Sequence, residues 1–293
     1  MRSIVDRYSP ILMTAPMLVI IVVFVIFLVY VVALSVTDST LAKPFQEFVG
    51  LENYKRALAD DAFRGSVWNM LLFAFVVTTV ETGLGFIIAL AVHSLIRGGR
   101  WLLTLALLPL FTPPVAVGMI WKLFYDPVSG FINHYLLRFG LIQDPIAFLG
   151  RTEWAMPAIM LADIWQWTAF CFLLILAALQ SLPHDPYEAA AVDGASAWQV
   201  FRRLTLPLVL PAVIITFLFR LLIALKVFDL VFMLTYGGPG SSTQVASFYI
   251  YKVGFTMFKT GYAAALTVLV FLLVSVIATG LTLGRQIFMA RGE

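Results

Sequence analysis

The feature that most constrains this chain is a set of long apolar runs that a water-exposed fold has no room to bury. The run over residues 11–36 holds no charged side chain, and neither does the run over residues 262–283. About 20 apolar residues carry a helix across the hydrocarbon of a bilayer. Hydrophobic residues make up 61% of the chain and charged residues 12%, against about half and about a quarter in soluble domains. The sequence therefore predicts an integral membrane protein and excludes a soluble globular enzyme.

Six apolar runs are long enough to span a membrane: residues 11–36, 67–92, 101–125, 154–182, 206–234 and 262–283. We predict an all-α membrane protein with six transmembrane helices, and we treat residues 1–293 as one transmembrane domain. The first run is too long for the core of a signal peptide, so we expect it to be retained. Six spans put the two termini on the same side. The lysines and arginines of the loops divide evenly between the sides, which favours cytoplasmic termini only weakly.

Composition also argues against several other functions. The net charge is only +3 and the chain has no basic cluster, so nucleic-acid binding has no electrostatic footprint. His93, His134 and His184 lie far apart, without metal-ligand spacing. An enzyme working inside the membrane needs a nucleophile with its base, or metal ligands, at mid-depth, and these histidines do not supply them. The lone Cys171 lies within an apolar run and is interpreted as a small core residue.

The loop over residues 183–205 carries the most information. Asp185 is expected to cap a short, alanine-rich helix over residues 186–193, with Glu188 reaching back to the cap. Gly194 is a typical stop for such a helix. The pattern predicts a first short helix at the membrane surface that ends in a turn.

A second helix is predicted directly after that turn. Ser196 and Gln199 have the spacing of a capping box, and the helix is expected to end before Pro207. A thin alanine helix flanked by Glu188 and Asp193 fits a groove on a partner protein. The alternative is an interfacial helix-turn-helix that only links two spans.

The same loop resembles a known family motif. Residues 188–195 (Glu-Ala-Ala-Ala-Val-Asp-Gly-Ala), followed by Phe201 and by Thr-Leu-Pro at residues 205–207, resemble the EAA loop of binding-protein-dependent ABC importers. Further segments are similar to the sugar-transport permeases related to the maltose system: residues 50–54, the Leu108-Pro109 and Pro113 region, residues 234–240 and residues 262–266. Together these segments cover nearly the whole chain.

The resemblance implies a type I ABC importer permease fold in a bacterial inner membrane, with this loop and both termini in the cytoplasm. It implies a permease subunit that forms half of the path for a sugar or sugar derivative by alternating access. The implied partners are a second permease subunit, two ATPase subunits, an extracytoplasmic sugar-binding protein and the lipid bilayer. The chain holds no Gly-x-x-x-x-Gly-Lys-Ser/Thr sequence, so ATP and Mg are expected on the ATPase partners and no cofactor on this chain.

In this family the first loop helix lies in a cleft of the ATPase, and ATP-driven closure moves it and switches the accessible side of the cavity. Carried over to this sequence, the ATPase-coupling residues are Tyr187, Glu188, Ala189, Ala190, Asp193, Gly194 and Ala195.

Charged residues inside a membrane are costly and are functional candidates by default. Asp163 begins a polar and aromatic stretch, and such a carboxylate suits sugar hydroxyls; it is alternatively a structural ion pair with Arg220. Arg220 leads to the hypothesis that the solute carries a phosphate, sulfonate or carboxylate group.

Glu81 lies among threonines and is expected to face a neighbouring helix. Lys226 and Asp229 are expected to pair at i, i+3.

The resemblance and the aromatic stretch together suggest the substrate-binding positions Leu110, Pro114, Asp163, Gln166, Trp167, Arg220, Ala224 and Val227. The family offers mainly small polar and amide groups at such positions. Leu110, Pro114, Ala224 and Val227 depart from that pattern, so either the pocket lies mainly on the partner permease or the substrate differs. Pro113 and Pro114 are expected to break the third span where it lines a cavity.

One rival function remains, a stand-alone secondary carrier or channel. Such a protein predicts internal repeats between its halves and no loop for a partner. The first three spans do not repeat in the last three.

Overall fold

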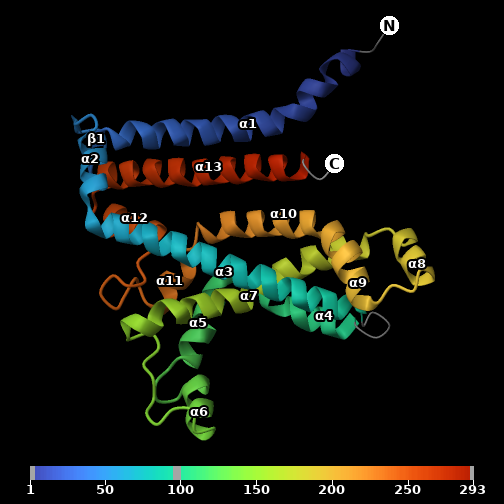
Figure 1. The fold of residues 1–293 in the computed structure, drawn as a ribbon. Helices are drawn as coiled ribbons and strands as arrows, with labels where there is room; N and C mark the ends of the chain where they lie inside the picture. Colours follow the sequence, from blue (N-terminus) through green and yellow to red (C-terminus); the bar gives the residue numbers. More distant parts are fainter. Residues whose placement is uncertain (1–3, 95–99, 291–293) are drawn as a thin grey trace. The chain divides into compact units, whose positions relative to one another are not determined.

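The computed structural model describes residues 4–94 and 100–290, and it is built almost entirely of helices (Figure 1). The predicted all-α membrane fold is confirmed: five helices are long and apolar enough to span a membrane, or six if a sharply bent pair counts as one span. The long helices are α1 (Ile4–Ser35), α3 (Asp61–Ser94), α7 (Thr152–Gln180), α10 (Leu206–Ala224) and α13 (Thr260–Ala290). The chain divides into two compact units, which are described in turn.

The bent pair is the predicted third span. It consists of α4 (Arg100–Leu107), the 3₁₀ turn η1 (Leu108–Phe111) and α5 (Pro114–Phe124), with a bend of 100°. Thr112 and Pro113 are extended at the bend, with ψ of 126° and 139°. Proline cannot donate the backbone hydrogen bond that would continue the helix. The predicted break is therefore confirmed, as a sharp corner.

The first unit joins most of the first 63 residues to residues 249–273. It contains α1, the short antiparallel strands β1 (Thr37–Asp38) and β2 (Glu47–Phe48), α2 (Glu52–Ala59), the π-helix η3 (Lys252–Thr256) and the first part of α13. Asn53 donates to the carbonyls of Ser35 and Thr37, both at 3.0 Å. The bond to Ser35 satisfies an acceptor that the end of α1 leaves free, and the bond to Thr37 ties β1 to α2. The motif over residues 50–54 thus fixes the C-terminal end of α1.

Asp60 is the polar centre of this unit. One carboxylate oxygen accepts from the N–H groups of Ala62 (2.9 Å) and Phe63 (3.3 Å) at the start of α3, and the other accepts from the hydroxyls of Tyr249 (2.6 Å) and Tyr262 (2.7 Å). Burial alone raises the pKa of Asp60, but these four hydrogen bonds outweigh it and hold the pKa below the ordinary value.

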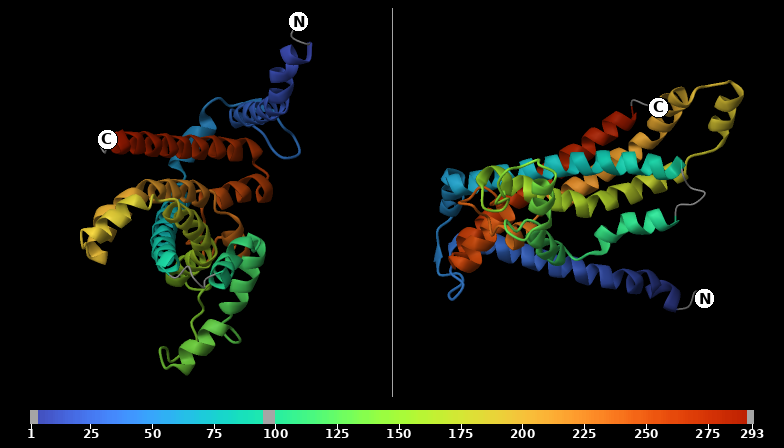
Figure 2. Two further views of the ribbon diagram at one scale, coloured as in Figure 1. Left: turned by 90° about the vertical axis from the view of Figure 1, so that its right-hand side faces the viewer. Right: turned by 90° about the horizontal axis from the view of Figure 1, so that it is seen from below.

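The second unit spans residues 64–248 and the end of α13. Its remaining helices are α6 (Phe131–Arg138), α8 (Asp185–Val192), α9 (Ala197–Val200), α11 (Asp229–Leu234) and the start of α12 (Ala246–Tyr251). α3, α7 and α10 lie side by side, with α8 and α6 toward opposite ends of this bundle (Figures 1 and 2). Apolar side chains of the three helices form a buried core: Ala89, Phe172, Ile175, Leu176, Leu179 and Val209.

The loop over residues 183–205 forms the predicted helix-turn-helix, with one difference at its start. α8 begins at Asp185, and His184, already helical at φ −80° and ψ −30°, takes the cap position without a side-chain bond. Asp185 is therefore not the cap; its carboxylate lies in the first turn, where negative charge suits the helix dipole. Gly194 ends the helix at φ +71°, and the Ser196–Gln199 capping box is present.

The second loop helix does not end before Pro207, contrary to the prediction. It continues through α9 and a π-helical segment, η2 (Phe201–Thr205), directly into α10. A proline removes one N–H and clashes with the carbonyl four residues earlier. The wider i→i+5 pattern of η2 absorbs this irregularity one turn before the proline, so the chain stays helical.

Candidate functional site

The second unit contains a cavity of about 170 Å³ beside α5, α7, α10 and α11. The sequence-predicted positions on its wall are Pro114, Asp163, Gln166, Trp167, Arg220, Ala224 and Val227. Leu110 lies on η1 and is not among the lining residues. Positions that are far apart in the sequence are thus brought together around one hollow. Sequence reasoning did not assign Lys226 and Asp229 to this site, although both line it.

A break in the fifth span opens this cavity. The predicted continuous span over residues 206–234 is wrong: α10 ends at Ala224 and α11 begins at Asp229. The last turn tightens, because the N–H groups of Lys226 and Val227 bond only three residues back. Ser247 donates its hydroxyl to the carbonyl of Val227. A tertiary contact therefore replaces the bond that would continue the helix.

The break also separates Lys226 from Asp229. In the part of the chain that the structure describes, neither side chain makes an ion pair, so the predicted pair is wrong. Side chains three residues apart face each other only on a continuous helix, and α10 ends before these two residues. A free ammonium group and a free carboxylate are therefore available at the cavity wall.

Gln166 connects the cavity to the corner of the third span. Its side chain is 2% exposed, and Nε2 donates to the carbonyl of Thr112 at 2.8 Å. Among the described residues, its Oε1 atom has no hydrogen-bond partner. A buried polar atom without a partner is uncommon and needs an explanation, such as a bound ligand or water.

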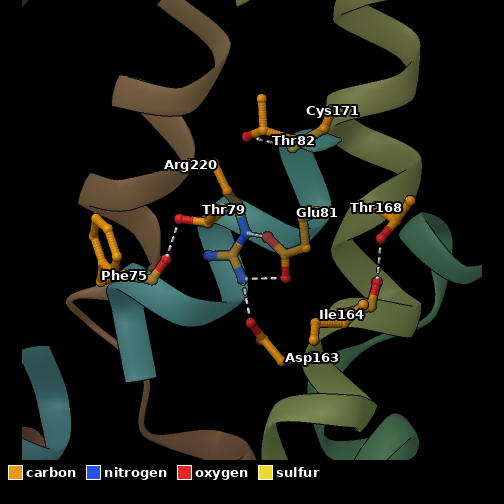
Figure 3. Close-up of polar contacts among 9 residues, drawn as sticks. All are labelled: Phe75, Thr79, Glu81, Thr82, Asp163, Ile164, Thr168, Cys171 and Arg220. Carbon is orange, nitrogen blue, oxygen red and sulfur yellow. Dashed lines mark hydrogen bonds and ion pairs between the residues drawn. The ribbon is translucent and has the colours of Figure 1, made fainter. Parts of the chain in front are cut away.

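Three charged side chains from three spans meet beside the cavity, as Figure 3 shows. Nε of Arg220 lies 2.5 Å from Oε2 of Glu81, and Nη2 donates to Oε1 of Glu81 at 3.0 Å. The same Nη2 donates to Oδ2 of Asp163. Arg220 is 1% exposed, Glu81 0% and Asp163 4%. The Trp167 ring lies over the guanidinium, with its centroid 4.9 Å from Cζ.

This cluster confirms the Asp163–Arg220 pair and adds Glu81, for which the sequence indicated only a contact with a neighbouring helix. Buried charges need paired and hydrogen-bonded partners, and here the guanidinium has two carboxylates. Arg220 therefore has no charge left over for an anionic solute. Lys226 is the other cation on the wall of this cavity.

The predicted coupling residues lie at the opposite end of the bundle from α6 (Figures 1 and 2). None of the residues of α8 is buried, and Val192 is 88% exposed. Tyr187 is the member that turns inward, since its hydroxyl donates to the hydroxyl of Thr205 at 3.2 Å. The other members remain exposed or half-buried: Glu188, Ala189, Ala190, Asp193, Gly194 and Ala195.

A polar cavity beside broken spans, in a helical membrane bundle with an exposed helix-turn-helix, fits a transport permease. Residues 81–283 match the family model described as "Binding-protein-dependent transport system inner membrane component", and the chain belongs to this family. It is a permease subunit of an ABC importer rather than an enzyme. This membership argues against a stand-alone carrier or channel.

The chain is similar over most of its length to characterised permeases. It is 38% identical to the trehalose/maltose transport system permease protein MalF of Thermococcus litoralis, over 79% of this chain and 77% of the relative. It is 34% identical to the sulfoquinovosyl glycerol transport system permease protein SmoG of Agrobacterium fabrum, over 92% and 87%. It is 32% identical to the sn-glycerol-3-phosphate transport system permease protein UgpA of Salmonella typhimurium, over 93% and 92%.

A solved structure shares the fold. A bacterial ABC transporter involved in the import of the acidic polysaccharide alginate matches with a TM-score of 0.83 and 26% identity, over 96% of each chain. A bacterial alginate ABC transporter in complex with an alginate pentasaccharide-bound periplasmic protein matches with a TM-score of 0.80 and 26% identity, over 94% of each chain.

Proposed function

We propose that this chain is the membrane subunit of an ATP-driven, binding-protein-dependent importer for a sugar or sugar derivative, and that the cavity beside α10 and α11 is part of the sugar's path. The relatives named above carry trehalose or maltose, a sulfoquinovosyl glycerol and a glycerol phosphate. These solutes share hydroxyl groups that both donate and accept hydrogen bonds.

The unpartnered Oε1 atom of Gln166 carries this proposal. An acceptor buried without a donor costs about 1–3 kcal/mol, so a solute or water that supplies one is favoured. Lys226 offers further donors, Asp229 offers acceptors, and the Trp167 ring offers an apolar face. A few placed polar groups on a partly apolar wall are typical of a small-molecule site.

The size of the cavity supports a pocket shared with a second permease subunit. Its volume is about 170 Å³, below the roughly 300–1,000 Å³ of most ligand sites. Ala224 and Val227 add no polar contact to its wall, so further polar groups are expected from the partner. Of the predicted positions, Leu110 is the one that this proposal now leaves outside the site.

Neutral sugars and anionic sugar derivatives should depend differently on the charged residues of the cavity wall. Glu81 and Asp163 already compensate Arg220. A solute with a phosphate, sulfonate or carboxylate group is therefore expected to depend on Lys226. A neutral sugar is expected to tolerate Lys226→Gln, because amide hydrogen bonds can replace those of the ammonium group.

Energy reaches the chain through the loop over residues 183–205. Under this proposal α8 docks in a cleft of one of two ATPase subunits, which bind ATP and Mg, and the predicted coupling residues contact it. The exposure of α8 and of Trp198, which is 66% exposed, supports a docking role. The contact between Tyr187 and Thr205 gives α8 a direct connection to the base of α10.

The same proposal sets the orientation. The loop and both termini face the cytoplasm of a bacterium whose inner membrane holds the chain, and a sugar-binding protein docks at the other end of the bundle. The turn over residues 237–240 is the candidate contact for that protein. The description of the family as an inner membrane component and the complex of the alginate transporter with its periplasmic protein support this arrangement.

The testing experiment measures ATPase activity of the assembled importer in lipid, with its binding protein. The panel contains maltose and trehalose as neutral sugars, with sulfoquinovosyl glycerol and sn-glycerol 3-phosphate as anionic solutes. We expect one class to stimulate hydrolysis, and we expect Glu188→Lys with Gly194→Pro to abolish that response. Glu153→Lys, at the exposed start of α7, is the control. A loop variant that assembles and responds normally would refute the coupling role.

A further inference from the structure

Glu81 lies behind the cavity wall rather than on it. It is 0% exposed and is not a lining residue, yet its two oxygens contact Nε and Nη2 of Arg220 at 2.5 and 3.0 Å. Asp163 does line the cavity, and it contacts Arg220 through Oδ2 alone. The two carboxylates therefore share one guanidinium unequally (Figure 3).

Because the guanidinium is shared unequally, Glu81 and Asp163 differ in how readily each can leave it. A carboxylate that contacts two nitrogens along one edge of a guanidinium, here through one hydrogen bond and one close ion pair, holds it in place better than a contact at one nitrogen. A buried arginine has to keep at least one such partner. Glu81 meets this need by itself, since its two oxygens face two nitrogens of the guanidinium. Asp163 meets the guanidinium at one nitrogen only and faces the space where a solute would lie.

We propose that Glu81 is a positioning residue for solute binding: it keeps Arg220 in place, so that Asp163 can exchange its contact with Arg220 for hydroxyl groups of the solute. This inference rests on the proposed solute site. The Trp167 ring, with its centroid 4.9 Å from Cζ, covers the guanidinium and keeps it from following the Asp163 carboxylate toward the cavity. Without Glu81, Asp163 is the remaining ion-pair partner of Arg220 in this cluster, and its carboxylate stays bound to the arginine.

If loss of Glu81 leaves Asp163 bound to Arg220, a second substitution at Arg220 should restore solute binding. If Glu81 only packs the bundle, it should not. Glu81→Gln keeps the shape of the side chain but removes its charge, so Asp163 becomes the sole carboxylate of this cluster that pairs with Arg220 and is no longer released to the solute. Adding Arg220→Gln removes the capturing charge and returns Asp163 to the cavity. If Glu81 served only to pack the bundle, the second substitution would add damage and restore nothing.

The experiment measures the Kd of the solute for the complete permease–ATPase complex in lipid nanodiscs, by titration calorimetry. The probe is the solute of the panel that stimulates the wild-type ATPase most strongly. We expect Asp163→Asn and Glu81→Gln each to weaken binding by about tenfold, the loss of one charged hydrogen bond. We expect Glu81→Gln with Arg220→Gln to recover binding to within about threefold of wild type. Glu153→Gln, a carboxylate change at the exposed start of α7, is expected to leave Kd unchanged.

The outcomes separate this inference from the proposed site. Unchanged binding by Asp163→Asn would overturn the proposed site itself. Weak binding by Asp163→Asn together with normal binding by Glu81→Gln would overturn only the positioning role, and so would a double variant no better than Glu81→Gln. If Glu81→Gln fails to assemble, Arg220→Lys replaces it. A lysine cannot hold the two-point contact, so about tenfold weaker binding is expected, and wild-type binding would refute the proposal.

Discussion

The side-chain amide of Gln166 donates to the backbone carbonyl of Thr112 at 2.8 Å, which ties the middle of α7 to the corner between η1 and α5. Pro113 follows Thr112 and the chain is extended there, so the helix leaves this carbonyl without its usual partner. Broken backbone inside a membrane persists only where other groups satisfy it. One side chain thus supports the corner with its nitrogen and offers its oxygen to the cavity.

Replacing Gln166 is therefore expected to affect both stability and binding. Gln166→Leu leaves the Thr112 carbonyl unsatisfied, and we expect the free energy of unfolding to fall by about 1–3 kcal/mol. Thermal unfolding of the detergent-solubilised importer measures this loss. Gln180→Leu, at the exposed end of α7, is the matched control. Equal melting temperatures for the two variants would contradict the role of the amide.

The close approach of α3 and α7 depends on Gly85. A Cβ atom there would lie 2.7 Å from the backbone nitrogen of Phe172, whereas nothing lies within 4 Å of a Cβ at Gly83. We expect Gly85→Ala to lower the free energy of unfolding by about 1–3 kcal/mol, because the helices have to separate. Gly83→Ala is expected to stay within about 1 kcal/mol of wild type. Parallel unfolding measurements compare them, and equal losses would refute close packing at Gly85.

The turn after α8 is expected to control coupling. Gly194 has φ +71°, a conformation that costs other residues about 1–2 kcal/mol. Because no atom lies within 4 Å of a Cβ at Gly194, Ala adds strain there without a clash. We expect Gly194→Ala to lower sugar-stimulated ATPase activity severalfold, and Gly194→Asn to retain more of it, since asparagine tolerates this conformation. Equal activity in the two variants would show that the turn geometry is not what matters.

Part of the pH dependence of the protein's stability is expected to come from the ionised carboxylate of Asp60. Its pKa lies below the ordinary 3.8, so its contribution is present at neutral pH and is lost only as the pH falls below about 4. Asp60→Asn is expected to lower the melting temperature at neutral pH, because its hydrogen bonds and helix cap are weakened, and to flatten the dependence below about pH 4. Asp144→Asn, at an exposed aspartate, is the comparison. A full acid-side dependence in Asp60→Asn would exclude this carboxylate as its source.

Much of this fold follows from local sequence patterns. Apolar runs identify the spans, Pro113 marks the corner, and the spacing of Ser196 and Gln199 gives the start of the second loop helix. Each of these features depends on residues that lie close together in the chain, so the sequence alone is sufficient to find them.

The features that the sequence did not reveal depend on distant residues. The end of α10 at Ala224 involves Ser247, which bonds the carbonyl of Val227 from twenty residues away. The partner of Arg220 includes Glu81, which is 139 residues away. Helical periodicity contains no information about such contacts, and for this reason the expectation of a Lys226–Asp229 pair is wrong.

The most direct test of the account asks whether the solute occupies the cavity. In a Cys171→Ala background, Ile223→Cys puts a thiol on the cavity wall, and Val128→Cys puts one at a position that is 97% exposed on the surface. Labelling with a small, charged thiol reagent is compared in the complete importer with loaded and with empty binding protein. We predict that the solute slows labelling at position 223 and leaves the labelling rate at position 128 unchanged. Equal labelling rates at position 223 with and without solute would contradict the proposed site.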